Sequence, residues 1–380
     1  MLDIESLRLI WWVLLGVLFI GFAITDGFDL GAAALMPLVA RTESERRVVL
    51  NTVGPFWEGN QVWLILGAGA IFAAWPYVYA VAFSAFYWLM LLLLLTLGIS
   101  RPVSFKYRSK LTNVFWRRTW DWIVVIGGVF PAIIFGLLVG NILLGIPFHF
   151  EKDLRVFYTG SFLDLLQPFA WWCGFTSLMM LTMHGGLYLA IKTEGVIRQR
   201  AIFWARLAAS CLIVLFALGG LWIAHLSGYV LISGGEPQGY SNPLHKEVVI
   251  LTGAWLKNYS RYPLTLIMPV LGLVGAGVAL LAANWGNSRF AFICSSISLF
   301  GIISTVGVSM FPFILPSSSD FGSSLLVWDA SSTYLTLLIM LASVIIFMPI
   351  ILIYTAWVYR ALRGKVSVEA IEKDESHTAY

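Results

Sequence analysis

The chain has 380 residues, of which 59% are hydrophobic and only 12% are charged, and its formal net charge is +4. Soluble domains carry roughly 25% charged residues, so this composition excludes a water-soluble globular protein. The mean hydropathy of +0.85 and the 17 Trp and 26 Phe residues, which are types that collect at membrane interfaces, indicate an integral membrane protein.

Apolar segments of about 20 residues, the length that crosses the hydrocarbon core of a bilayer, recur along the whole chain. They predict an all-α, polytopic transmembrane protein, with residues 1–380 forming a single integral membrane domain. The first segment could continue to Ala40, as one long tilted helix or as a helix followed by a shallow segment. The nine predicted spans are residues 10–30, 53–73, 78–99, 122–144, 166–190, 205–226, 264–283, 290–311 and 334–358.

The N-terminal sequence MLDIESLRLIWW differs from a secretory signal. Its leading region carries Asp3 and Glu5 in place of a positive cluster, and no small-residue cleavage site follows the apolar segment. We therefore expect the first helix to remain in the mature protein.

The basic residues predict the orientation of these spans. Eighteen of the 24 Lys and Arg residues fall on the side of the odd-numbered loops and the C-terminal tail, which includes Lys373. Basic residues concentrate in cytoplasmic loops, so the N-terminus is predicted to be periplasmic and the C-terminus cytoplasmic. The basic residues lie where the orientation of the spans requires them, so the net positive charge does not indicate a nucleic-acid partner. The six basic residues on the other side are Arg8, Lys152, Arg155, Lys246, Lys257 and Arg261.

The sequence FWEGNQVW at 56–63 places polar side chains at the start of the second predicted span. With the helix entering near Thr52, Glu58 lies roughly 9 Å into the span, flanked by Trp57, Asn60 and Gln61. An acid inside a span is costly to insert and is by default a functional candidate, here a proton-carrying or ligand-binding group. The alternative is an interfacial carboxylate that reaches toward water or pairs with an arginine.

The first span ends in a second acidic pair, Asp26 and Asp29 of TDGFDLG. These residues are three apart and share a helix face. The neighbouring Gly27 and Gly31 are also compatible with a helix end and two solvated acids. Arg101, which is predicted to begin the basic loop after the third span, is a plausible partner for either acid.

We do not predict a metal or cofactor site within this chain. His184 lies well inside a span with Met180 four residues earlier, but residues at this spacing share one helix face and cannot be opposite axial ligands of one haem. A hydrogen-bonded packing role is therefore expected for His184. Cys173, Cys211 and Cys294 fall within spans and form no CxxC pair, which favours small buried side chains over a disulfide or metal site.

The outer loop 311–333, FPFILPSSSDFGSSLLVWDASST, is rich in serine. Ser331 or Ser332 is expected to cap the last span, because hydroxyl side chains accept hydrogen bonds from the free N–H groups of a first helical turn.

Five motifs, taken together and in order, resemble subunit II of the cytochrome bd quinol oxidases, and most closely the enterobacterial type. The similarity covers essentially the whole chain, including the opening RLIWWVLLGVLFIGFAITDGFD. The five motifs are DGFDLG, FWEGNQVWLI, RPVSFKYRSK, SNPLHKEVV and MFPFILPSS.

This resemblance implies a subunit of two four-helix bundles and one peripheral helix, paired with a structurally similar subunit I in the bacterial cytoplasmic (inner) membrane. The complex would oxidise ubiquinol or menaquinol and reduce O₂ to water with protons from the cytoplasm, so that a proton motive force arises without pumping. Haem b558, haem b595 and haem d would be held by ligands of subunit I. The resemblance also implies small single-span accessory subunits and, in some members, a tightly bound ubiquinone or menaquinone.

One departure from the family concerns the expected proton route. The acid of the GNQVW motif is often Asp preceded by His in this family, whereas this chain has Trp57 and Glu58. Glu can carry protons in place of Asp, but the missing His removes one possible relay group.

Two other functions compete with this interpretation. One is a proton-coupled secondary transporter, although the inverted repeats of such proteins are not visible in this sequence. The other is a scaffold without a part in the chemistry.

Overall fold

A computed structural model describes residues 2–372 of the chain. Lys373, one of the basic residues used for the orientation, lies outside them. The helices are α1 (Ile4–Val39), α2 (Glu43–Val53), α3 (Trp57–Ala74), α4 (Pro76–Ala85), α5 (Tyr87–Leu93), the π-helical η1 (Leu94–Ser100), α6 (Arg101–Tyr107), α7 (Val114–Leu144), α8 (Pro168–Lys192), α9 (Gly195–His225), α10 (Lys257–Arg261), α11 (Ile267–Asn284), α12 (Ser288–Met310), α13 (Tyr334–Ala361) and α14 (Val368–Glu372).

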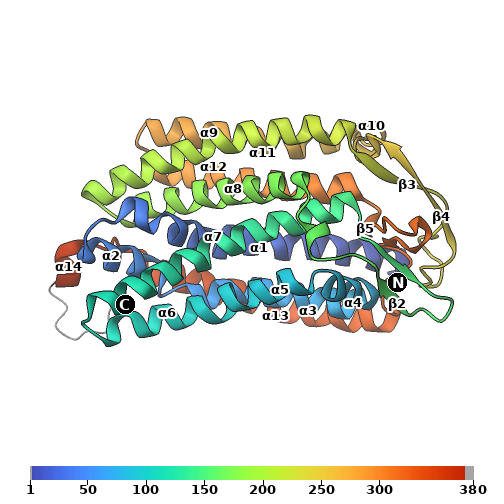
Figure 1. Cartoon of the computed structure of the whole chain (residues 1–380), viewed down its shortest axis with the longest axis horizontal. Helices are drawn as coiled ribbons and strands as arrows, with labels where there is room; N and C mark the ends of the chain where they lie inside the picture. Colours follow the sequence, from blue (N-terminus) through green and yellow to red (C-terminus); the bar gives the residue numbers. More distant parts are fainter. Residues whose placement is uncertain (1, 373–380) are drawn as a thin grey trace.

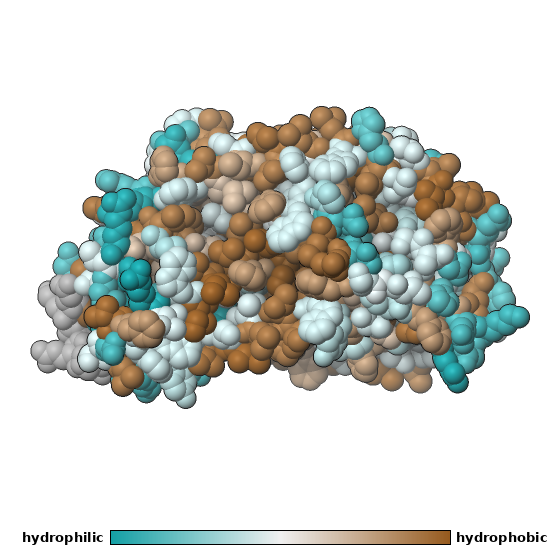
Figure 2. All heavy atoms as spheres, in the orientation of Figure 1, coloured by the Kyte–Doolittle hydropathy of each residue, from teal (hydrophilic) through white to brown (hydrophobic). Residues whose placement is uncertain are grey.

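The long helices lie side by side along one direction, as Figure 1 shows. Among the described residues, eight helical segments are long and apolar enough to cross a membrane, and the bent pair α3–α4 brings the number to as many as nine. Hydrophobic residues dominate the middle of the face in Figure 2, while hydrophilic residues gather toward its two ends. The predicted polytopic helical membrane fold is confirmed.

The spans pack in two groups. Helix α1 contacts α3 and α7, and α7 contacts η1 and α6. In the second group α8 contacts α9 and α12, while α11 contacts both α9 and α12. Helix α13 packs against α1 and α3 but buries only Leu337 and Leu341. This arrangement agrees with two bundles and one peripheral helix, and the two groups meet where α1 and α7 both contact α8.

The fourth and sixth spans begin earlier than predicted, at Val114 and Gly195, and the first three spans differ from the prediction in their course. The first continues as one helix to Val39. The second is interrupted, because Pro55 lacks the N–H that would continue the ladder of α2, and α3 begins only at Trp57. The third was predicted at 78–99, but α4 bends by 119° from α3 and the apolar span runs over 87–110.

One end of the molecule carries three two-stranded antiparallel sheets, which the all-α prediction did not include (Figure 1). The strands come from the connections between spans, and each pairs with its neighbour in sequence. They are β1 (Phe148–Phe150) with β2 (Val156–Tyr158), β3 (Ser227–Gly234) with β4 (Lys246–Thr252), and β5 (Phe313–Leu315) with β6 (Leu325–Leu326).

The last span is capped by Thr333, whose hydroxyl accepts a hydrogen bond from the backbone N–H of Thr336. The prediction of a Ser331 or Ser332 cap is therefore wrong. The Ser332 hydroxyl instead donates to the carbonyl of Ala73 at 2.5 Å, and Ser331 accepts from Arg8 at 2.8 Å. These two serines tie the outer loop to α3 and α1.

Candidate functional site: a buried polar cluster between α1, α3 and α6

Asp26 and Asp29 lie in the middle of α1, and both are fully buried. The alternative of a helix end with two solvated acids is wrong, because α1 continues for ten residues beyond Asp29 to Val39. Gly31 permits a close contact with α8, since a Cβ at that position would lie 1.9 Å from the carbonyl oxygen of Leu181. The glycines of TDGFDLG thus serve helix packing, and this packing removes the acids from water.

Arg101 is the partner of one of these acids. Its Nη2 lies 2.7 Å from Oδ1 of Asp26, and neither side chain is exposed to solvent. The prediction that Arg101 begins a loop is wrong, because Arg101 is the first residue of α6 inside the shifted third span. Gly127 on α7 leaves room for it, since a Cβ there would lie 3.0 Å from the Cβ of Arg101.

Asn60 connects the other acid to the last span. The Asn60 side-chain amide donates to Oδ2 of Asp29 at 2.8 Å and to the carbonyl of Thr25 at 3.3 Å. The Asn60 side-chain oxygen accepts a 2.6 Å hydrogen bond from the hydroxyl of Tyr359. Sequence reasoning missed Tyr359, because it lies 299 residues away among apolar residues and carries no local signal of a polar partner.

Several buried atoms of this cluster have no hydrogen-bond partner among the described residues: Oδ2 of Asp26, Oδ1 of Asp29, and Nε and Nη1 of Arg101. Buried polar atoms in proteins are nearly always hydrogen-bonded to protein or water. Two carboxyl groups with one guanidinium are electrically neutral only when one carboxyl holds a proton, and uncompensated buried charge is costly. The cluster therefore has the composition to bind water and one exchangeable proton.

Glu58 does not join this cluster. It is the second residue of α3, its side chain is 64% exposed, and its carboxylate lies 3.3 Å from Nζ of Lys106, which is itself 59% exposed. Gln61 is only half-buried. Trp57 is buried and stacks on Phe105. Of the polar candidates in FWEGNQVW, the structure brings only Asn60 into contact with the acids of α1.

A second group of charges lies at the same end of the bundle and was not predicted. Arg108, which is almost fully buried, lies 2.5 Å from Asp121 and 2.9 Å from Glu43. Asp121 also pairs with Arg46, and Glu43 with Arg117. These pairs connect α2, α7 and the end of the third span. Each of the five residues forms at least one ion pair within this group, which indicates a structural role, although Nη1 of Arg108 has no hydrogen-bond partner among the described residues.

The opposite end is held together by buried charges of its own. Arg8 is fully buried and donates to the carbonyls of Pro237 and Gly239, at 2.6 and 3.0 Å. Lys246 lies 2.6 Å from Asp329. Burial lowers the pKa of Lys246 and raises the pKa of Asp329. The charge of Asp329 opposes the shift of Lys246, and the charge of Lys246 opposes the shift of Asp329.

His184 has the predicted hydrogen-bonded packing role. Its Nδ1 lies 2.7 Å from the hydroxyl of Ser295, its Nε2 lies 2.9 Å from the carbonyl of Ile24, and its ring stacks on Phe292. With both ring nitrogens engaged, His184 does not fit as an axial haem ligand. Among residues 2–372, no three His, Cys, Asp or Glu side chains are grouped as metal ligands would be.

The fold and this site define a multi-pass helical membrane protein with a buried, partly unpaired acid–arginine cluster, and ionisable residues inside a membrane mark a candidate functional site. The chain matches the family model of cytochrome bd terminal oxidase subunit II over residues 7–362. It belongs to that family, and it is a multi-pass protein of the bacterial inner membrane.

Its relatives match over nearly their whole length. The chain is 45% identical over 381 residues to cytochrome bd-I ubiquinol oxidase subunit 2 of Escherichia coli K12, with 100% of both chains covered. It is 29% identical over 364 residues to cytochrome bd ubiquinol oxidase subunit 2 of Bacillus subtilis, covering 95% of this chain and 97% of that one. The fold resembles a chain in the structure of bd oxidase from Geobacillus thermodenitrificans, with a TM-score of 0.68, 13% identity, and 95% and 100% of the two chains covered.

Proposed function

We propose that this chain, as subunit II of a cytochrome bd-type quinol:O₂ oxidoreductase, supplies part of the route by which cytoplasmic protons reach the oxygen-reducing site. Subunit I would be its partner, with small single-span subunits as further components. Ubiquinol is the proposed substrate, because the relatives from Escherichia coli and Bacillus subtilis are ubiquinol oxidase subunits. Haems b558, b595 and d would lie in subunit I, in keeping with the engaged nitrogens of His184.

The observation that carries this proposal is the hydrogen-bonded chain from the half-buried Tyr359 through the buried Asn60 to the buried Asp29, with the Asp26–Arg101 pair one helical turn away. Hydrocarbon does not conduct protons, so a route needs groups that hold a proton and orient water. Asp29 has no ion pair among the described residues, so it is the group proposed to take up and release the proton. Arg101 would hold Asp26 ionised beside it, and Asn60 would orient the Asp29 carboxyl.

Glu58 has a different proposed place in this route. Its exposure and its pairing with Lys106 suit a group that collects protons at the surface of this chain, ahead of the buried cluster. A longer acid than the Asp often found in the family would have more reach there. Trp57, next to Glu58, packs against Phe105 and would position the start of α3 rather than carry protons.

The first prediction concerns Asp29. We expect Asp29→Asn, measured in the assembled complex in lipid vesicles, to lower quinol oxidase turnover about a hundredfold, the lower end of typical proton-transfer contributions. The substitution keeps shape and hydrogen bonding but removes the exchangeable proton, so the haem absorption spectrum should be unchanged. Glu58→Gln should also lower turnover, and Glu58→Asp should retain most of it. Oxygen consumption and proton uptake from the inside of the vesicles are the readouts.

Asp153→Asn is the matched control, because Asp153 is an exposed acid at the opposite end of the molecule, paired only with Arg155. Wild-type turnover in Asp29→Asn with an intact haem spectrum would place the proton route elsewhere and favour a scaffold role. Proton-coupled solute uptake by this chain without subunit I would instead support a secondary transporter.

A further inference from the structure

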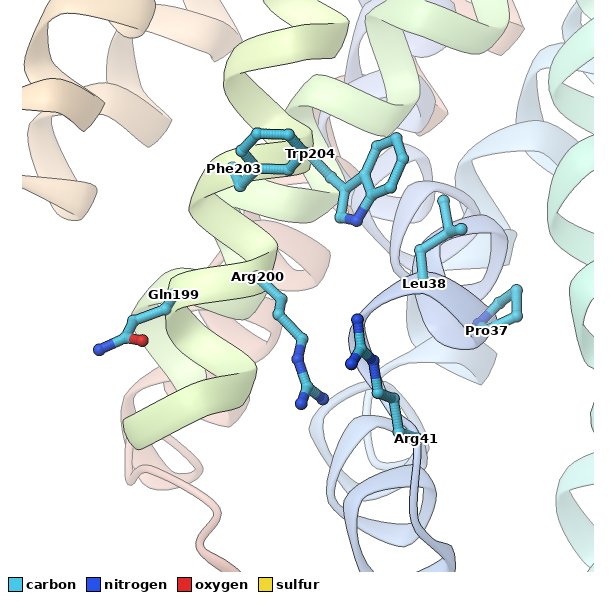
Figure 3. A pocket seen from close by; sticks show the side chains of 7 residues that line it. All are labelled: Pro37, Leu38, Arg41, Gln199, Arg200, Phe203 and Trp204. Carbon is cyan, nitrogen blue, oxygen red and sulfur yellow. The ribbon is translucent and has the colours of Figure 1, made fainter.

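A hollow of about 440 Å³ lies between the end of α1 and the first turns of α9 (Figure 3). This volume is within the range of small-molecule sites. The hollow is at the end of the bundle that carries the basic loops, and none of its lining residues belongs to the polar cluster described above. Its lining residues are Pro37, Leu38, Arg41, Gln199, Arg200, Phe203 and Trp204.

Two arginines supply the polar part of this hollow, and both extend into the gap between the two helices (Figure 3). Arg200 is already engaged, since its Nη1 lies 3.1 Å from Glu45 and 3.1 Å from the carbonyl of Val39. The side chain of Arg41 is exposed and has neither a hydrogen bond nor an ion pair among residues 2–372. The Glu45 carboxylate thus neutralises one arginine and leaves Arg41 as the uncompensated positive charge.

The apolar part of the hollow lies deeper along the same two helices. Phe203 and Trp204 follow Arg200 on α9, so they are further than Arg200 from the N-terminus of this helix at Gly195. Pro37 and Leu38 precede Arg41, so they lie closer to the membrane-spanning part of α1. Phe203 is 59% exposed and Leu38 41% exposed. Each of the two segments therefore has an arginine nearer the end of the bundle and large apolar side chains nearer its middle.

We propose that this hollow binds one anionic phospholipid of the cytoplasmic leaflet. The lipid phosphate would lie against the Arg41 guanidinium, with Arg200 beside it, and an acyl chain would run along Phe203, Trp204 and Leu38. Basic pockets between spans on the cytoplasmic side suit anionic headgroups, and aromatic side chains are favoured at the same depth. A free anion would use only the polar half and leave the apolar half without an occupant.

The test uses the complete complex, exchanged into detergent and titrated with phosphatidylglycerol, with bound lipids counted by native mass spectrometry. We expect Arg41→Gln to bind the lipid about fivefold more weakly, the factor that corresponds to about 1 kcal/mol for one basic residue near an anionic surface. Arg41→Lys should retain most of the binding, because the charge is kept. Phe203→Ala should also weaken binding, because it removes apolar contact with the acyl chain.

Arg118→Gln is the matched control, since Arg118 is an exposed arginine at the same end of the molecule but outside the hollow, and it should bind lipid like the wild type. Phosphatidylethanolamine should be retained less than phosphatidylglycerol by the wild type. Equal retention of the two lipids, or of phosphatidylglycerol by wild type and Arg41→Gln, would overturn the proposal. Binding of inorganic phosphate that is indifferent to Phe203→Ala would show a free-anion site and would also overturn it.

Discussion

At the scale of single residues, the acids of this chain differ in what surrounds them rather than in their local sequence. Asp29 and Glu58 each stand in a glycine-containing motif beside an apolar span, and both looked like intramembrane acids. Asp29 is fully buried and hydrogen-bonded to Asn60, whereas Glu58 is exposed and paired with Lys106. Burial depends on which helices pack around an acid, so the motif alone did not distinguish them.

Asn60 is the residue on which the cluster's hydrogen bonds converge, and replacing it tests that arrangement. Asn60→Leu leaves Asp29 Oδ2 and the Tyr359 hydroxyl without their partner, and an unsatisfied buried polar group costs about 1–3 kcal/mol. We therefore expect a lower thermal midpoint for the complex, measured by loss of the haem absorption on heating.

The control for this prediction is Gln61→Leu, the same chemical change at the next residue. Gln61 is half-buried and has no hydrogen bond among the described residues, so its replacement should leave the midpoint close to that of the wild type. Equal shifts in both variants would mean that the Asn60 hydrogen bonds add nothing to stability.

At the scale of elements, helix packing in this chain depends on glycines at which two backbones meet. Gly31 of α1 faces Leu181 and Gly185 of α8, and a Cβ at Gly185 would lie 2.4 Å from backbone atoms of Gly31 and Ala32. Small residues at a helix crossing let the backbones approach, which is how helices associate in a membrane. The α1–α8 contact also joins the two groups of spans.

Gly31→Ala should therefore disturb assembly, because the new Cβ would lie 1.9 Å from the Leu181 carbonyl oxygen and a helix backbone must move. Overpacking of this kind costs about 1–3 kcal/mol, and the yield and thermal midpoint of the complex measure it. Gly16→Ala is the control on the same helix, since a Cβ there has no atom within 4 Å. A wild-type yield for Gly31→Ala would contradict the close contact.

At the scale of the whole molecule, the asymmetry of basic residues predicts the orientation of the spans. A reporter enzyme fused after Tyr380 should be active in the cytoplasm, and one inserted near Gly235, just beyond β3, should report the periplasm. The eighteen-to-six distribution of Lys and Arg requires this under the positive-inside rule. A periplasmic C-terminus would overturn the nine-span topology.

The last prediction concerns which subunit of the complex holds the haems. The chain expressed and purified without subunit I should carry no stoichiometric haem, because His184 is committed to Ser295 and to the carbonyl of Ile24. An optical spectrum of the purified chain checks this. A full complement of haem b in that spectrum would contradict the prediction.

By itself the sequence determined the membrane class, the approximate positions of the spans and the predicted orientation. These properties depend on local composition, since a bilayer requires about 20 apolar residues per helix and basic loops remain in the cytoplasm. The sequence also contained most of the candidate cluster, with Asp26, Asp29, Asn60 and Arg101 all recognised as polar groups near spans.

Only the tertiary structure decided which of these residues meet. Tyr359 reaches Asn60 because α13 packs against α3. Arg101 reaches Asp26 because the third span runs over 87–110 instead of 78–99. The bend between α3 and α4 lies at Trp75, directly before Pro76, and the shift of the third span places Arg101 in a helix, where it is buried, instead of in a loop. Contacts between residues far apart in the chain depend on the packing of whole helices, and no local pattern encodes that packing.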